Sequence, residues 1–436
     1  MTLLQSPGCW VVVVAPGKAL VSEIAASLRK GTRHIGVSVE CVTSQSDALD
    51  LPKGKVIRVI PTTALLDLLA KRDPTIPLVG PSLVVCENLE LLDSTYELGI
   101  SLLRHATQSS PTRFVGFSSS LNDCSDLANW LDVDQSALHS FRPRDRDQLL
   151  TFSTQAFTIP QSAALFKTMA KSAHASIRIA PSTESAVVFV PSRAQCRGVA
   201  RDLLTQCALE SESERGYLPS DASSDRLEDS FARLLDGSLI DFVSKGVGFF
   251  HEGIHKADRQ LMLSLYADGI LRVLIVPRES CWTLPVRASV VTVMGTQYLH
   301  IEENGTDRQL RDYALTDLVR MQSRAVRHIG SGHFNLFCQA ETKDTFLRFL
   351  QDGLPLESQL LESNDLEKWL NIQKDRMGSL NEQHLLDTLS FTFLSRRIVS
   401  NPAYYDCQPG AKAENLSRIV DKLMGNGCML GSVSTS

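Results

Sequence analysis

The segment from residue 251 to residue 255 has the residue types of a metal site. His251-Glu-Gly-Ile-His255 matches the H-E-x-x-H pattern of zinc hydrolases. That chemistry needs a helix that places both histidines on one face, with the glutamate as base. Here the motif directly follows an apolar run and contains Gly253, so we expect a loop, with a helix that starts just before Lys256. The sequence therefore predicts no metal, and it places His251 where functional loops of α/β domains gather.

Phosphate chemistry needs a glycine-rich loop or a group of arginines. The pattern G-x-x-x-x-G-K-[ST], whose backbone N–H groups would cradle a triphosphate, occurs nowhere in the printed sequence. Arg324 and Arg327 lie three residues apart on an expected helix, where they would share a face and could stabilise phosphoryl charge. A solvated helix face is the alternative interpretation of this spacing.

Composition limits the class of partner. The 44 basic and 49 acidic residues give a net charge of −5, which argues against a protein that holds nucleic acid by bulk charge alone. The ten cysteines are scattered without a C-x-x-C pair, which favours reduced thiols in a cytosolic or nuclear protein. Because no apolar run approaches the roughly 18 residues of a membrane span, we expect no membrane partner.

Short apolar runs alternate with helical periods in most of the chain. Apolar runs without alternation, separated by helices, are typical of parallel strands covered on both faces. The first expected strands are 11–14, 56–60, 83–85, 113–117 and 149–155, and a second series is 186–190, 247–250, 271–276 and 290–294. We therefore expect two α/β domains, the second of which carries a polar, acidic surface insertion near residues 210–241.

The strand pattern fades after about residue 345. Ser379 and Glu382 match a capping box. Leu385, Leu389 and Phe393 follow at intervals of four, which predicts the buried face of one helix that Arg396 and Arg397 close. We expect a small helical domain here, with a short hairpin near residues 428–433.

The order of the motifs resembles the superfamily-two RNA helicases of the Ski family. The matching segments are Ala15-Pro-Gly-Lys-Ala-Leu20 (motif Ia), Val84-Val-Cys-Glu-Asn-Leu89 (Walker B), Phe117-Ser-Ser-Ser-Leu121 (motif III), Phe189-Val-Pro-Ser-Arg193 (motif IV), Gly246-Val-Gly-Phe-Phe-His-Glu-Gly253, Leu274–Trp282 (motif V), Gly295-Thr-Gln-Tyr298 and Met321–Arg327 (motif VI). Leu354–Ser358, Thr392–Arg397 and Asn401–Tyr405 are similar to the winged-helix domain of that family. Each motif alone is weak, but together they cover nearly the whole chain.

The resemblance implies an organisation and a set of site residues. It implies a truncated RecA-like domain at 1–155, a second RecA-like domain at 156–345 and a winged-helix domain at 346–436. The remnants of the catalytic set would be Glu87, Arg324 and Arg327. The candidates for an RNA channel would be Pro16, Ser118, Ser192, Arg193, His251 and Arg278.

The departures from the family pattern bear on activity. Cys86 stands where the family has the aspartate that holds Mg²⁺, and a thiol is a poor ligand for that hard cation. Leu89 replaces the family's histidine. Motif Ia begins at residue 15, so we expect the first domain to lack its opening strand and phosphate loop. Further departures are Thr283, Pro285, Arg320, Ser323, Val326 and His328.

Two functions from different classes remain open. The first is a degenerate cassette without a cofactor, which binds proteins and regulates an active cassette of a spliceosomal helicase in pre-mRNA splicing. The alternative is an ATP- and Mg²⁺-dependent RNA helicase that lacks its catalytic N-terminal part. For the first function, we expect ribonucleoprotein partners, an active helicase cassette as a further partner and RNA as a further ligand. The resemblance implies the nucleus, with the cytoplasm as the alternative.

Overall fold

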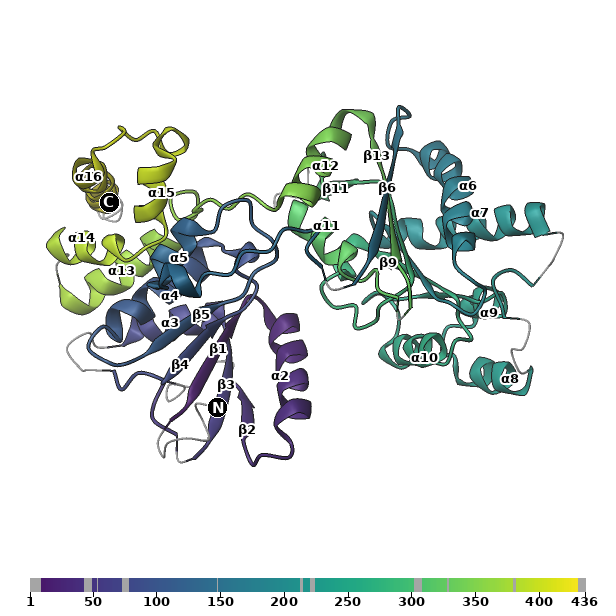
Figure 1. Ribbon diagram of the computed structural model, residues 1–436, viewed down its shortest axis with the longest axis horizontal. Helices are drawn as coiled ribbons and strands as arrows, with labels where there is room; N and C mark the ends of the chain where they lie inside the picture. The colour runs from purple at the N-terminus through teal and green to yellow at the C-terminus, as the bar shows by residue number, and fades with distance from the viewer. Residues whose placement is uncertain are drawn as a thin grey trace, which may run out of the picture. The chain divides into compact units, whose positions relative to one another are not determined.

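The computed structural model describes residues 9–42, 49–52, 54–72, 78–146, 148–211, 215–219, 224–301, 308–327, 329–378 and 382–429. The chain divides into two compact units, of which the first comprises residues 1–141 with 353–436 and the second residues 142–352. Each unit contains its own parallel sheet (Figure 1). The prediction of an α/β protein with two parallel sheets is therefore confirmed.

Five parallel strands form the sheet in the described part of the first unit, in the order β2-β3-β1-β4-β5. The strands are β1 (Val11–Ala15), β2 (Ser38–Cys41), β3 (Val56–Pro61), β4 (Leu83–Cys86) and β5 (Arg113–Gly116). Figure 1 shows helix α2 (Lys18–Thr32) on one side of the sheet and α3 (Thr62–Lys71) and α4 (Ser94–Ala106) on the other. Strand β1 is buried along its whole length because both faces are covered.

The C-terminal helices belong to this first unit. They are α13 (Asp365–Met377), α14 (Glu382–Ser390), α15 (Leu394–Ser400) and α16 (Lys412–Met429), and α5 (Ser125–Leu131) packs against α15. Ala70 of α3 and Leu98 of α4 share one apolar cluster with Leu366 and Leu394. Helix α16 runs through Cys428 and Met429, which contradicts the start of the predicted hairpin, and residues 430–433 lie outside the described residues.

The helix predicted through residues 382–397 is two helices. Between α14 and α15, the Thr392 hydroxyl donates to the Leu389 carbonyl (2.6 Å) and the Ser395 hydroxyl to the Ser390 carbonyl (2.9 Å). Such hydroxyls compete with the helical backbone bonds. The prediction of one continuous helix is therefore wrong, but its apolar residues are buried as predicted: Leu385, Leu389 and Phe393 are each 2% exposed. Ser379 of the proposed capping box lies outside the described residues.

Six parallel strands form the sheet in the described part of the second unit, in the order β6-β13-β10-β7-β9-β8. These strands are β6 (Leu150–Phe157), β7 (Ala186–Val190), β8 (Val247–Phe249), β9 (Val273–Pro277), β10 (Val290–Met294) and β13 (Gly332–Gln339). A separate antiparallel ribbon pairs β11 (Gln297–Ile301) with β12 (Arg308–Asp312). The helices are α6 (Ala163–Ile179), α7 (Arg193–Ser211), α8 (Ser224–Arg233), α9 (Ile240–Val243), α10 (Lys256–Ala267), α11 (Leu315–Gln322) and α12 (Lys343–Asp352).

The strand predicted at 149–155 belongs to the second sheet. The predicted boundary at residue 155 assigns it to the first domain, but β6 pairs in parallel with β13 over its whole length. The boundary at residue 155 is therefore too late for this strand. At the other end, Phe346 and Leu350 of α12 lie in the core of the second unit, beyond the predicted boundary at residue 345. The three-domain division itself stays a prediction.

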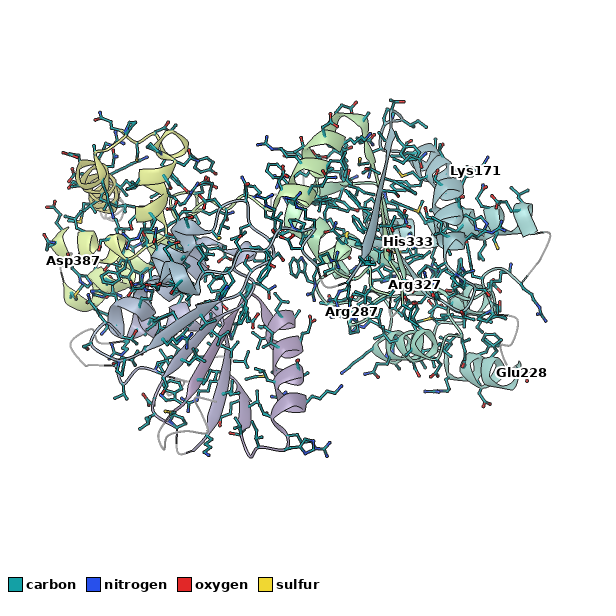
Figure 2. All side chains as sticks on the ribbon, viewed as in Figure 1. Lys171, Glu228, Arg287, Arg327, His333 and Asp387 are labelled. Atoms are coloured by element: carbon teal, nitrogen blue, oxygen red, sulfur yellow. The ribbon has the colours of Figure 1, made fainter. Side chains whose placement is uncertain are left out.

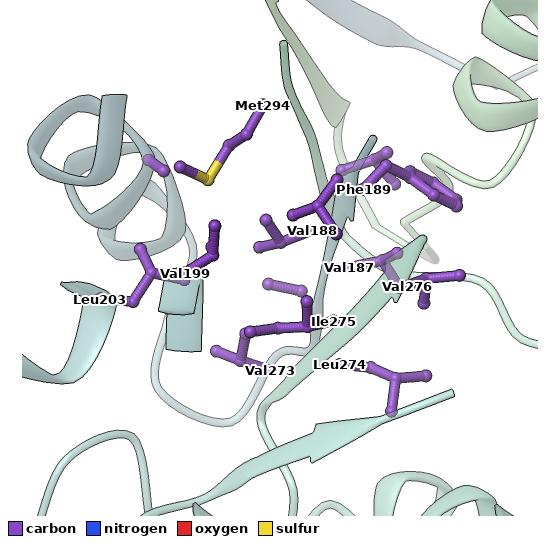
Figure 3. Packing of buried hydrophobic residues seen from close by; sticks show 14 of the residues in the cluster. Val187, Val188, Phe189, Val199, Leu203, Val273, Leu274, Ile275, Val276 and Met294 are labelled. Carbon is purple, nitrogen blue, oxygen red and sulfur yellow. The ribbon is translucent and has the colours of Figure 1, made fainter. Parts of the chain in front are cut away.

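The core of the second unit shows why its strands are apolar without alternation. Figure 3 shows Val188, Val273 and Ile275 on the face of the sheet toward Val199 and Leu203 of α7. Val187, Phe189, Leu274 and Val276 point to the opposite face. Both faces of β7 and β9 are therefore covered, as in the parallel sheets of α/β proteins. Among the described residues, no helix is long and apolar enough to cross a membrane.

Candidate functional site

The carboxyl ends of β1, β4 and β5 bring three predicted site residues to one edge of the first sheet. Strand β4 lies between β1 and β5 in the sheet, so Pro16, Glu87 and Ser118 each follow a neighbouring strand. The loop after β4 is fixed by its backbone: the Glu87 N–H donates to the Val14 carbonyl (2.9 Å), and the Tyr96 hydroxyl donates to the Glu87 carbonyl (2.8 Å). Loops from three of the quoted motif segments therefore lie at this edge of the sheet.

Cys86 is the last residue of β4. Its side chain is completely buried. Burial raises the pKa of the Cys86 thiol far above its ordinary value, and the adjacent Glu87 raises it further. The group is therefore a protonated thiol at neutral pH, whereas Mg²⁺ binds carboxylate and other hard oxygen ligands.

Glu90 is a carboxylate of this edge that sequence reasoning missed. It accepts hydrogen bonds from the Ser119 N–H (3.0 Å), the Ser119 hydroxyl (3.0 Å), the Ser118 hydroxyl (3.3 Å) and the Asn88 side chain (3.1 Å). Burial raises the pKa of Glu87, and the nearby Glu90 charge raises it further. An acidic residue among leucines, one turn after Glu87, was the available signal. The Ser118 hydroxyl is therefore a hydrogen-bond donor to Glu90 of the same chain.

Four other predicted residues meet at the carboxyl edge of the second sheet. Ser192 and Arg193 follow β7, His251 follows β8 by one residue, and Arg278 follows β9, which lies between β7 and β8. The Ser192 hydroxyl donates to the Gln195 side chain (2.7 Å), and Arg193 forms an ion pair with Glu279. The structure therefore brings the four together.

His251 lies in a turn and not on a helix. Helix α10 begins at Lys256, as predicted, and the His255 ring caps it by accepting from the Ala257 N–H (3.2 Å). A Cβ atom at Gly253 would lie 3.1 Å from Nδ1 of His251. Burial lowers the pKa of His251, and the Arg193 charge lowers it further. Among the described residues, no group of three or more His, Cys, Asp and Glu side chains could hold a metal ion.

Arg278 is held by side chains that the sequence did not identify. Its Nη1 donates to Asp317 (2.8 Å), and its guanidinium stacks 3.7 Å from the centroid of the Tyr298 ring. The Trp282 Nε1 also donates to Asp317 (2.8 Å). Asp317 of α11 therefore connects the loop after β9 to this helix, and Arg193 and Arg278 both have carboxylate partners within the chain.

The helix predicted to carry Arg324 and Arg327 ends before them. Helix α11 stops at Gln322, and Ala325 bridges in parallel to Ala288, just before β10. Arg327 pairs with Glu184, just before β7, at 2.7 Å. Figure 2 labels Arg327 together with Arg287 and His333, at the amino end of the second sheet. The shared helix face is therefore wrong, because the chain turns into an extended segment. Arg324 is buried, and His328 lies outside the described residues.

The architecture defines a class: a protein with two RecA-like parallel-sheet parts and motif-bearing loops at the carboxyl edges of both sheets. No family model matches the chain. It is 30% identical over 97% of its length to the human U5 small nuclear ribonucleoprotein 200 kDa helicase. It is 29% identical to the Arabidopsis thaliana DExH-box ATP-dependent RNA helicase DExH12 over 95%, and to the Saccharomyces cerevisiae RQC trigger complex helicase SLH1 over 96%.

These similarities confirm the resemblance predicted from the motifs. The chain is homologous to the cassette of the Ski-family RNA helicases. The matched part of the chain covers 20%, 19% and 22% of the length of these three relatives. The chain therefore spans about a fifth of their length.

Proposed function

We propose that this chain is a degenerate helicase cassette that does not hydrolyse ATP and acts as a protein-binding, regulatory module beside an active cassette. Cys86 carries the proposal. A buried, protonated thiol at the end of β4 replaces the carboxylate that phosphoryl transfer needs to hold Mg²⁺. Glu87 alone, with its pKa raised by burial, does not replace that ligand. Accordingly, the proposal includes no ATP or Mg²⁺ cofactor.

The second sheet supports the same proposal. Arg193 and Arg278 are each paired with a carboxylate of the chain, so RNA phosphates would have to compete with Glu279 and Asp317 for them. Pro16, Ser118, Ser192 and His251 remain RNA-channel candidates on this proposal, and Arg324 and Arg327 remain catalytic remnants.

The names of the relatives support a setting for the module. Because one relative is a U5 small nuclear ribonucleoprotein helicase, we place this chain in the nucleus, in pre-mRNA splicing, with ribonucleoprotein partners. Residues 353–436 would be the winged-helix domain of the cassette, built on α13–α16. The packing of these helices against α3 and α4 would make them one rigid body with the first sheet.

ATP hydrolysis tests the proposal directly. Phosphate release by the purified chain with Mg²⁺-ATP, with and without single-stranded RNA, should equal that of Glu87→Gln. Losing metal positioning should cost several powers of ten in rate, since electrostatics supply most of this catalysis. RNA-stimulated hydrolysis that disappears in Glu87→Gln would contradict the proposal and support the ATP-dependent helicase instead. Activity that appears only in Cys86→Asp would support the role given to Cys86.

A further inference from the structure

The ribbon of β11 and β12 leaves an apolar face open. Leu299 pairs directly with Leu310, and Ile301 pairs with Arg308. Because alternate residues of a strand share a face, Leu299, Ile301 and Leu310 lie on the same side of the ribbon. They are 54%, 55% and 50% exposed, and every residue of β12 is exposed. Large apolar side chains that share one open face mark an interaction surface.

The opposite face anchors the ribbon to the second unit. Tyr298 packs against the core and stacks on Arg278, which Asp317 holds. At the base of β11, the Gln161 side chain donates to the Gln297 carbonyl (2.7 Å). The ribbon is therefore fixed at its base, with the apolar face directed away from its anchor.

The edge strand is complementary to itself. Its sequence is Arg308-Gln-Leu-Arg-Asp312. If two copies pair antiparallel about a two-fold axis at Leu310, Arg308 of each copy lies opposite Asp312 of the other, and Leu310 lies opposite Leu310. Side chains two residues apart share a face, so both ion pairs would flank the leucines on the apolar side.

We propose that β12 is a homodimerisation edge, at which a second copy of this chain extends the ribbon into a four-stranded antiparallel sheet. In the described part of the chain, β12 pairs only with β11, so its outer edge offers a row of backbone groups. The dimer would join the apolar faces of both ribbons, with Leu299 and Leu310 of each copy in one row. Such a contact is isologous and closes at two copies.

The dimer should be weak. One five-residue edge is far smaller than the interface of a stable dimer, so we expect a dissociation constant of about 10–1000 μM. It would therefore form where copies are concentrated or held together by other contacts.

Charge reversal provides the test, by sedimentation equilibrium of the whole chain over this concentration range. Arg308→Asp and Asp312→Arg should each weaken the dimer at least about tenfold, because each replaces two attractive cross-strand pairs with two repulsive ones. An equimolar mixture of the two variants should associate again, since the two carboxylates of one variant's strand then face the two guanidinium groups of the other's. The control Arg201→Asp, which reverses a charge on an exposed position of α7, should leave the association unchanged.

The mixture also separates a lost contact from a lost fold, because only folded ribbons can pair again. A wild-type chain that stays monomeric throughout the range would overturn the proposal. So would dimers that persist in both single variants, or variants that fail to associate when mixed. If the variants instead lose affinity for duplex RNA with no change in mass, the ribbon is a nucleic-acid element.

Discussion

The two carboxyl edges of the sheets are occupied in different ways. At the first edge, Cys86 is a neutral thiol inside the core, and Glu90 is surrounded by the hydroxyl and N–H donors of the neighbouring loop. At the second edge, charged groups remain, but Arg193 and Arg278 are paired with Glu279 and Asp317. The first edge presents a neutral thiol at the end of β4, whereas the second edge carries charges and balances them internally. The comparison teaches that loops at the same kind of sheet edge can be fixed either by hydrogen bonds to one buried carboxylate or by ion pairs within the chain.

The first way to sharpen this comparison is to ask whether the fold around the first edge depends on the C-terminal helices. Phe393 is buried, and its ring packs against the Trp130 ring of α5 with 5.8 Å between the two ring centroids. We expect Phe393→Ala to lower the free energy of unfolding by about 3–5 kcal/mol, because it removes a ring and leaves a cavity. Denaturant unfolding should show the loss, with Val399→Ala, at an exposed position, as the control. A loss below about 1 kcal/mol would contradict the shared core.

A buried acid in the first unit predicts that its contribution to stability falls as pH rises, opposite in sign to that of His251 at the second edge, whose pKa is lowered by burial. Glu97 accepts from the Ser358 hydroxyl (2.6 Å) and the Leu394 N–H (2.7 Å), so it connects α4 to the C-terminal helices. Burial raises the pKa of Glu97 from 4.5 to about 7 despite these bonds. Because the folded state holds the proton more tightly than the unfolded state, this contribution is complete below about pH 4.5 and is lost as pH rises through about 7.

The variant Glu97→Gln tests that sign. It keeps the shape and removes the titration, so the stability of the variant should change less between pH 5 and pH 8 than that of the wild type. The wild type should lose on the order of 1–3 kcal/mol more than the variant over that interval. Parallel pH profiles for the two proteins, measured by urea unfolding, would show that the carboxyl group does not titrate there.

The internal pairing at the second edge predicts a smaller effect. Asp317→Asn should lower stability by roughly 1–2 kcal/mol, since it weakens charged hydrogen bonds from Arg278 and Trp282. Asp67→Asn, which breaks the exposed pair with Lys71, should have almost no effect. The intrinsic tryptophan fluorescence, to which Trp282 contributes, should shift in the first variant only. If Asp317→Asn instead increases RNA affinity with unchanged stability, the ion pair with Asp317 prevents Arg278 from binding RNA and does not stabilise the loop.

Residue patterns predicted the central strands well because those strands are buried on both faces. Runs such as 11–14, 186–190 and 290–294 match β1, β7 and β10 closely. Strand β13 was missed because it contains His333 and Asn335, and the buried Asn335 is satisfied by Ser153 (2.6 Å) and Thr292 (3.4 Å) across the sheet. No local pattern reveals such partners.

The resemblance named Ser192, Arg193, His251 and Arg278 as RNA-channel candidates, and the structure brings them to one edge because strands of a parallel sheet end together. Their role in an RNA channel stays a prediction. The positions of Arg324 and Arg327 could not be predicted, because the end of α11 depends on the bridge from Ala325 to Ala288, which is a contact between distant residues. Asp317 and Tyr298 were missed for the same reason, since their importance lies in what they touch.

The division of the chain has a consequence for its synthesis. The second unit is one continuous stretch, whereas the first needs residues 353–436 to complete the cluster around Leu98. On the ribosome, the second unit can therefore finish folding before the first unit, although residues 1–141 of the first unit are synthesised earlier. Until the last helices emerge, Ala70 and Leu98 lack part of their cover, and the nascent protein must wait with apolar surface available to chaperones.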